Sequence, residues 1–221
     1  MTAIVLPHEQ LPRIAVLGAG HVGPAIARVA LEAGYNVSIA ASGAPEKIDL
    51  IAQILAPGAE PRLAADAVEE AGIVVLAIPL HTFKKLNPSL LVGKLVIDVM
   101  NYWPPIDGVQ EMFDDHQYGS SEIVQRRLAR STVVKTLNHI GYHELEGERR
   151  LTGSPDRRAL GVAGDDPRAV GVVAEFIERI GYDAVQFDSL SAGRLLEPGG
   201  PVFGALLRRS EFEQAVRAGA V

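Results

Sequence analysis

The chain has 221 residues, a formal net charge of −6 and no cysteine. Its length fits one domain with a small appendage, and the lack of thiols excludes disulfides, thiolate nucleophiles and cysteine-ligated metals. Lys and Arg form no run long enough to bind nucleic acid. The longest apolar run is too short to cross a bilayer, and the N-terminus lacks the features of a signal peptide. We therefore expect a soluble, cytoplasmic protein with no nucleic-acid or membrane partner.

Short apolar runs alternate with amphipathic stretches along the chain. The runs predict buried strands at residues 14–17, 37–40, 73–77, 95–98, 132–135, 160–163 and 184–187, and a shorter strand at 61–63. Helices are predicted at residues 24–33, 45–55, 66–71, 167–180 and 202–218. Continuous apolar strands separated by helices are typical of a doubly wound, mostly parallel α/β sheet covered on both faces.

A glycine-rich turn joins the first predicted strand to the first predicted helix. Its sequence, Gly18-Ala19-Gly20-His21-Val22-Gly23, matches the G-x-G-x-x-G pattern in the strand–turn–helix context that gives this pattern meaning. Gly18 permits the tight turn, Gly20 lets a pyrophosphate approach the backbone, and Gly23 lets helix and strand pack closely. The helix directs its free N–H groups at the phosphates. His21 either contacts a phosphate or ribose, or faces solvent.

The glycine turn indicates a Rossmann-type dinucleotide-binding domain, which we place at residues 13–188. An N-terminal extension at 1–12 precedes it. A C-terminal helical segment at 189–221 follows it and is too short to be an independent domain.

The end of the second predicted strand selects between NAD and NADP. An NAD-preferring fold places an acidic residue there to bind the ribose 2′-hydroxyl, but this chain has none at Ile39-Ala40-Ala41-Ser42-Gly43. Ser42 could donate a hydrogen bond to a 2′-phosphate, and Lys47 could neutralise it. We therefore favour NADP. Alternatively, Ser42 only helps to start the next helix and Lys47 is solvated.

The residues that follow the other strands form the rest of the candidate site, because ligands of doubly wound sheets bind at the strands' carboxyl ends. They are Ile78-Pro79-Leu80-His81, Val99-Met100-Asn101-Tyr102-Trp103, Leu137-Asn138-His139 and Gly164-Asp165. Apolar surface with two amides suits a flat ring held by packing and a carboxamide held by hydrogen bonds.

Groups for acid–base or metal chemistry are sparse. His139 and His143 have helical spacing, but Gly141 intervenes and no third ligand is evident, so we expect no metal site. His81 has no obvious acidic partner in the sequence. A dehydrogenase of hydroxy acids or alcohols needs a group that takes the hydroxyl proton. Its absence favours hydride transfer between two ring cofactors, which carry the chemistry themselves.

The chain resembles the NADPH-dependent oxidoreductases of coenzyme F420, an 8-hydroxy-5-deazaflavin. The resemblance covers residues 13 to about 203 and rests on motifs that occur in family order. These are Ile14-Ala-Val-Leu-Gly-Ala-Gly-His-Val-Gly23, Val74-Val-Leu-Ala-Ile-Pro79, Val96-Ile-Asp-Val-Met-Asn101, Ser120-Ser-Glu122, Val133-Val-Lys-Thr-Leu-Asn138, Val162-Ala-Gly-Asp-Asp-Pro167 and Arg194-Leu-Leu-Glu-Pro-Gly199.

The resemblance implies which residues bind the two cofactors. NADP would contact Gly18, Ala19, Gly20, His21, Val22, Gly23, Ala41, Ser42, Lys47, Ile78, Pro79, Leu80, Asn101 and Asn138. The deazaflavin would stack on the nicotinamide, in a pocket formed by His139, Ile140, Arg194, Glu197 and Pro198. The family also implies a homo-oligomer, a dimer here, in which the small tail completes the neighbour's surface.

The chain departs from the family pattern in two places. Its glycine loop lacks an extra residue that such enzymes often carry, and Ala41-Ser42 stands where they often have Ser-Arg for the 2′-phosphate. Relatives that use no deazaflavin share most of the motifs. Two alternatives therefore stay open: an NAD(P)H-dependent reductase of a flavin, quinone, metal chelate, carbonyl or imine, and a non-catalytic dinucleotide sensor.

Overall fold

The computed structural model describes residues 11–113 and 117–219, so most of the predicted N-terminal extension lies outside the described residues. Within this range an eight-stranded sheet has the order β3-β2-β1-β4-β5-β6-β7-β8. The strands are β1 Ile14–Leu17, β2 Val37–Ala40, β3 Glu60–Pro61, β4 Ile73–Leu76, β5 Leu95–Asp98, β6 Thr132–Lys135, β7 Ala159–Gly164 and β8 Asp183–Phe187. Neighbouring strands are parallel except β6 and β7. The predicted doubly wound, mostly parallel Rossmann sheet is confirmed.

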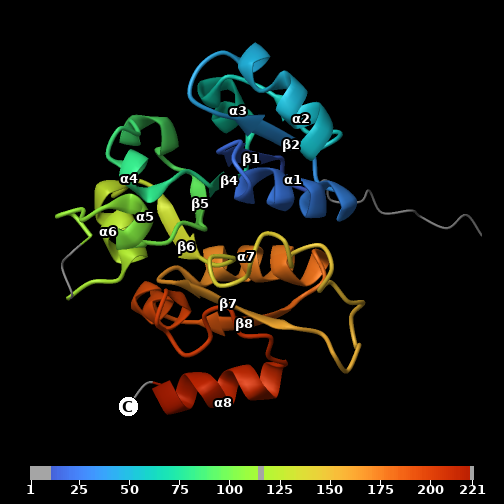
Figure 1. Ribbon diagram of the computed structural model, residues 1–221, viewed down its shortest axis with the longest axis vertical. Helices are drawn as coiled ribbons and strands as arrows, with labels where there is room; N and C mark the ends of the chain where they lie inside the picture. The colour runs from blue at the N-terminus through green and yellow to red at the C-terminus, as the bar shows by residue number, and fades with distance from the viewer. Residues whose placement is uncertain (1–10, 114–116, 220–221) are drawn as a thin grey trace, which may run out of the picture.

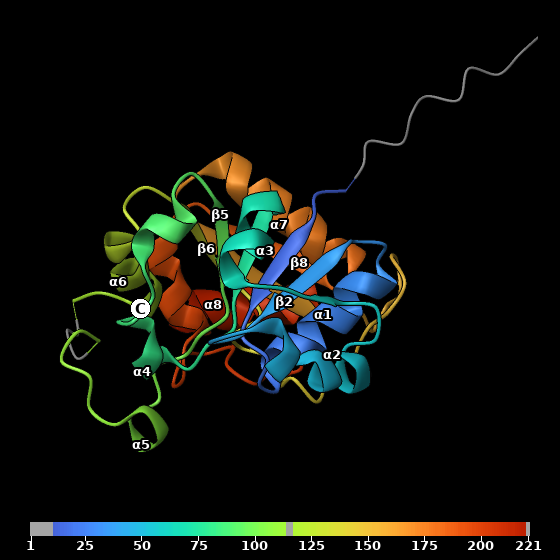
Figure 2. The same ribbon diagram turned by 90° about the horizontal axis from the view of Figure 1, so that it is seen from above.

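Helices connect the strands. The α-helices are α1 Val22–Glu32, α2 Asp49–Leu55, α3 Ala64–Glu70, α4 Leu80–Phe83, α5 Pro104–Asp107, α6 Ser120–Arg127, α7 Pro167–Arg179 and α8 Arg209–Gly219. The 3-10 helices are η1 Pro45–Lys47, η2 Pro88–Leu91 and η3 Leu190–Leu196. In both views α4, α5 and α6 gather on one side, away from α1 and α2 (Figures 1 and 2). None of these helices has the length and apolar character needed to span a bilayer.

The sheet is buried on both faces, which explains the continuous apolar runs. Side chains alternate along a strand, so Ile14 and Val16 of β1 pack in a core with α1 and α7. Ala15 and Leu17 of the same strand pack in a second core, with α3 and α6. A small third cluster lies between β7, β8 and α8, where Phe212 is the buried anchor of α8.

Two predicted helices differ from the structure by more than two residues. The helix predicted at 45–55 is split at Ile48 into η1 and α2. The terminal helix predicted from 202 begins only at Arg209. Gly204 has a left-handed φ of +69°, which is incompatible with a regular helix. Arg208 then pairs with Arg158 in a β-bridge, and its N–H donates to Glu211 Oε2 in a hydrogen bond that caps the helix start.

The direction of β7 corrects one expectation about the site. β7 runs antiparallel to β6, so Gly164 pairs with Val134 and the chain leaves β7 at the edge opposite to the carboxyl ends of β1, β4, β5 and β6. Gly164-Asp165 therefore does not join the other strand ends. Asp165 instead accepts a hydrogen bond from the N–H of Leu190, where η3 begins.

The segment after β8 returns toward the site along η3. A Cβ on Gly193 would lie 2.8 Å from the side chain of Lys135, at the end of β6. The carbonyl of Leu196, three residues further, accepts a hydrogen bond from Asn138. The tail is therefore tied to the same sheet edge as the glycine loop, whereas our division of the chain at residue 188 stays a prediction.

Candidate functional site

The glycine loop combines two crowded glycines with one open glycine. A Cβ on Gly18, whose φ is +131°, would lie 2.1 Å from Ala77 O, and a Cβ on Gly23 would lie 1.8 Å from Gly18 O. Packing within the protein therefore requires both. A Cβ on Gly20 would meet no atom within 4 Å. Packing within the protein therefore does not explain why this position is glycine. The close approach of a pyrophosphate to the exposed backbone does explain it.

The N-terminus of α1 is also open to an anion. Its N-cap residue His21 makes no side-chain capping hydrogen bond, and the first turn holds no acidic residue. Its free N–H groups and positive dipole end face outward beside Gly20, an arrangement that stabilises a phosphate. The His21 ring stacks on Tyr142, with ring centroids 5.2 Å apart, so it links the glycine loop to the segment after β6.

The turn after β2 brings Lys47 to the residues that we expect to bind the 2′-phosphate. A Cβ on Gly43, whose φ is +115°, would lie 3.5 Å from Lys47 Nζ. Ala41 is partly buried, whereas Ser42 and Lys47 are exposed. A hydroxyl and an ammonium group thus share one exposed turn, in which Glu46 is the acidic residue, next to Lys47. The end of β2 itself, at residues 39–43, has no carboxylate, and the two donors suit a phosphate.

The predicted contacts at the ends of β4, β5 and β6 differ in exposure. Ile78 is partly buried, Pro79 is exposed as the N-cap of α4, and Leu80 is buried. Asn101 and Asn138 bind one another: Asn138 Nδ2 donates to Asn101 Oδ1 at 2.9 Å, and Asn101 Nδ2 donates to Asn138 O at 2.7 Å. This amide pair joins the ends of β5 and β6. Its mutual hydrogen bonds occupy most of the donors and acceptors that we expected to bind the carboxamide of the cofactor.

The backbone before Asn138 has an unusual conformation. Leu137 has a φ of +61° and is the non-glycine residue with positive φ among the described residues. A left-handed leucine costs energy, and such residues concentrate at functional sites. Here the conformation turns Asn138 toward η3, where its Nδ2 also donates to Leu196 O at 2.6 Å.

His139 lies inside the protein. Its Nε2 accepts a hydrogen bond from the Gly161 N–H at 3.0 Å, and its Nδ1 lies 3.2 Å from Asn138 Oδ1. Burial, together with the nearby positive charges of Arg158 and Lys135, lowers the pKa of His139 to about 3. The imidazole is therefore neutral and connects β6 to β7. Ile140 beside it is also buried, and the contact of both with an acceptor stays a prediction.

A buried ionic network lies beneath the amide pair, and the sequence did not lead us to it. Lys135 Nζ donates to Met100 O and to Ser120 Oγ, both at 3.1 Å. It lies 3.8 Å from Asp98 Oδ2 and from Glu197 Oε1. Asp98 and Lys135 are direct partners in the β5–β6 register. The sequence did contain one signal of this network: Asp98 and Lys135, which have opposite charges, each end an otherwise apolar strand.

The network extends through α6 into the tail. Ser121 Oγ donates to Asp98 Oδ2 at 2.6 Å, and both the N–H and the hydroxyl of Ser120 donate to Glu197 Oε1 at 2.8 Å. Arg194 Nε lies 3.4 Å from Glu122 Oε2. Glu197 and Arg194 thus make protein contacts, while Pro198 is partly exposed beside them. Four of the motifs behind the family resemblance meet in this network.

His81 requires a correction, because the structure provides the acidic partner that the sequence did not reveal. His81 lies in α4, and its Nδ1 is 3.0 Å from Oδ1 of Asp107, the last residue of α5. The Asp107 side chain is 6% exposed and the His81 side chain is 43% exposed. The described residues thus contain a His–Asp pair close to the carboxyl end of β4.

Comparison with known proteins agrees with this geometry. Residues 13–102 match the family described as NADP oxidoreductase, coenzyme F420-dependent. This segment contains the glycine loop, the Ser42–Lys47 turn and Asn101. The resemblance found in the sequence is confirmed, and the match supports an NADP-dependent oxidoreductase.

Solved structures extend the comparison to most of the chain. A hypothetical protein from Sinorhizobium meliloti is 24% identical, with a TM-score of 0.76 over 89% of this chain and 95% of its own. A candidate F420-dependent NADP reductase from Arthrobacter sp. FB24 is 25% identical, with a TM-score of 0.68 over 83% and 87%. An imine reductase from Pseudomonas sp. is 18% identical, with a TM-score of 0.55 over 81% and 57%. No curated protein matches the chain.

The open position at Gly20 generates a test of the oxidoreductase domain. Gly20→Val should preserve the fold, because its Cβ meets no protein atom. It should weaken NADPH binding at least roughly tenfold by obstructing the pyrophosphate, a loss of about 1.4 kcal/mol. The matched control is Gly171→Val on α7, where a Cβ is equally unopposed. Fluorescence titration with NADPH and thermal unfolding measure both effects. Normal binding by the Gly20 variant would contradict the loop assignment.

The neutral His139 generates a pH prediction. Its pKa is about 3 in the folded protein and 6.5 ordinarily, so below pH 6.5 the unfolded chain takes up a proton that the folded protein refuses. The free energy of unfolding should therefore fall as the pH falls from about 6.5 to 4.5, with a slope approaching about 1.4 kcal/mol per pH unit from this residue. Urea unfolding of His139→Gln should lack this contribution, and exposed His143→Gln should keep it. Equal slopes in the two variants would refute the assignment.

Proposed function

We propose that the protein transfers a hydride between NADP(H) and a deazaflavin coenzyme of the F420 type. The observation that carries the proposal is the open backbone at Gly20 beside the uncapped start of α1, within a segment that matches the F420-dependent NADP oxidoreductase family. In this proposal the pyrophosphate lies on the α1 N-terminus. Ser42 and Lys47 bind the 2′-phosphate. The lack of a carboxylate at residues 39–43, where an NAD-preferring fold places one, supports NADP over NAD.

The nicotinamide in this proposal lies over the ends of β4, β5 and β6. Ile78 offers an apolar surface there, and the Asn101–Asn138 pair fixes the distance between two strand ends. When bound, NADPH supplies the hydride, and the protein supplies orientation and exclusion of water. The Lys135 network supports a second ring beside it, because it holds the tail from Arg194 to Pro198 against Asn138.

A second copy of the chain is part of the proposal. The resemblance to the family supports a homodimer in which the tail of one subunit completes the surface of its neighbour. Two exposed apolar side chains, Leu206 in the tail and Leu151 between β6 and β7, fit a covered surface.

The direct test mixes the purified protein with NADPH and an oxidised deazaflavin, and follows the loss of the visible absorbance of the deazaflavin. We expect NADPH-dependent loss that is clearly faster than with NADH. No loss with either nicotinamide cofactor would refute the proposal. The same assay should include a flavin, a quinone, a metal chelate, a carbonyl and an imine. Turnover of one of these compounds without deazaflavin would identify that compound as the acceptor in place of deazaflavin. Binding of the nicotinamide cofactor without any turnover would indicate a dinucleotide sensor.

A further inference from the structure

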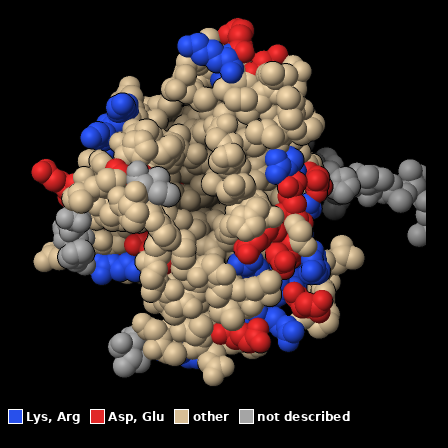
Figure 3. Space-filling view, in the orientation of Figure 1, with Lys and Arg blue, Asp and Glu red and all other residues tan. Residues whose placement is uncertain are grey.

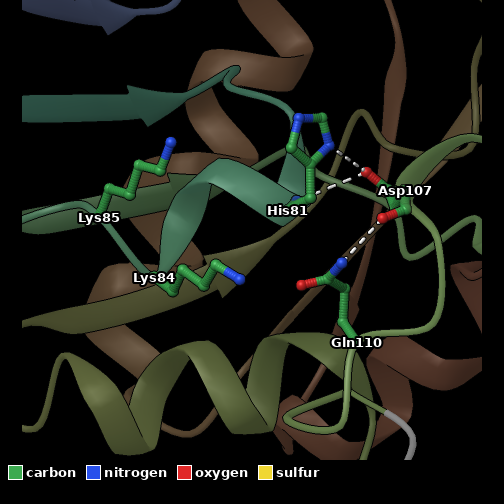
Figure 4. Close-up of a pocket in the computed structure, with 5 residues that line it drawn as sticks. All are labelled: His81, Lys84, Lys85, Asp107 and Gln110. Carbon is green, nitrogen blue, oxygen red and sulfur yellow. Dashed lines mark hydrogen bonds and ion pairs between the residues drawn. The ribbon is translucent and has the colours of Figure 1, made fainter.

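A small open pocket lies beside α4, outside the glycine loop. Its volume is about 340 Å³, and it is lined by His81, Lys84, Lys85, Asp107 and Gln110. In Figure 4 the His81 ring faces Asp107, and the Lys84 amine and the Gln110 side chain point toward the same space. The pocket begins two residues after Pro79, which belongs to the predicted NADP site. It therefore borders that site on the side of β4 and β5.

Asp107 fixes the orientation of the His81 ring. Its Oδ1 lies 3.0 Å from His81 Nδ1, and its Oδ2 accepts a hydrogen bond from the Trp103 N–H at 3.0 Å. Gln110 Nε2 donates to the Asp107 carbonyl at 2.8 Å, which holds the α5 end in place. With Nδ1 on the carboxylate, Nε2 of His81 has no partner among the described residues. The pair thus presents one oriented ring nitrogen, Nε2, which is an N–H donor in the imidazolium form.

The two lysines add positive charge that is not neutralised. Neither Lys84 nor Lys85 makes a side-chain hydrogen bond or ion pair with any described residue. The turn that carries them is fixed: Arg127 Nη2 donates to Lys84 O at 2.7 Å and to Leu86 O at 3.2 Å. Asp107 is the carboxylate among the lining residues, and its side chain is 6% exposed and already paired. Figure 3 shows basic side chains over the region of α4, beside a hollow with few charges.

We propose that this pocket binds an oxyanion, a phosphate or carboxylate group carried by the hydride acceptor. In the imidazolium form, Nε2–H of His81 would donate one hydrogen bond to the oxyanion, and the lysine ammonium groups would provide further positive charge. The chain as a whole has a net charge of −6, so these unpaired basic groups form a local positive region that attracts an anion. The acceptor assignment rests on the proposed hydride transfer, whereas oxyanion binding itself does not.

The first experiment titrates the intact protein with inorganic phosphate at saturating NADP⁺, which occupies the cofactor's own phosphate sites. The readout is the His81 ring resonance in NMR spectra, identified by its loss in His81→Gln. We expect a saturable shift, and Lys84→Gln/Lys85→Gln should weaken phosphate binding roughly tenfold, as expected for two exposed charges.

The matched control is Arg168→Gln/Arg217→Gln, which removes two positive charges from α7 and α8 and should leave phosphate affinity unchanged. No saturable shift of His81, or equal weakening in both double variants, would overturn the proposal. Because this titration needs no turnover, its result is independent of whether the proposed hydride transfer is correct.

The second experiment identifies the source of the oxyanion. It compares FMN, which carries a phosphate, with riboflavin, which carries the same ring without it, by quenching of flavin fluorescence. We expect the lysine double variant to weaken FMN binding roughly tenfold and to leave riboflavin binding unchanged. Equal effects on both flavins would overturn the assignment to the acceptor. Lost inorganic phosphate binding with unchanged FMN binding would assign the pocket to free phosphate instead.

Discussion

The carboxyl edge of the sheet depends on the burial of Lys135. An ammonium group without contact with water loses several kcal/mol of hydration, and only nearby carboxylates and oxygen acceptors can offset this loss. Asp98 and Glu197 supply the carboxylates, from β5 and from the tail, and Ser120 of α6 supplies a hydroxyl. Burying Lys135 therefore requires that three parts of the chain, far apart in sequence, meet at the end of β6.

The carboxyl edge of the sheet has two halves with different roles. On the side of β1 and β2 the backbone is open at Gly20, the start of α1 is uncapped and Lys47 covers its turn, so the chain leaves donors for a ligand. On the side of β5 and β6 the polar groups bind one another: Asn101 with Asn138, and His139 with Gly161. The first half is equipped to bind phosphates, and the second is a rigid support on which a ring can lie.

The sequence predicted the parts of this molecule that depend on local patterns. Strands buried on both faces are continuous apolar runs, and Gly18 to Gly23 sit between one such strand and a helix, so both were recognisable. The direction of β7 was not, because the link from β6 lacks a helix that would indicate a parallel crossover. The pairing of His81 with Asp107 and the Lys135 network were also missed, since their members are separated by up to about a hundred residues. Only the folded register brings Asp98 opposite Lys135.

The central claim is that NADP lies along the carboxyl ends of β1 and β2. Amide hydrogen exchange, measured with and without saturating NADP⁺, tests it most directly. The account predicts slower exchange at the amides of residues 20–25 and 42–47, with the second segment protected less by NAD⁺, which lacks the 2′-phosphate. Unchanged exchange at residues 20–25 in the presence of bound cofactor would contradict it.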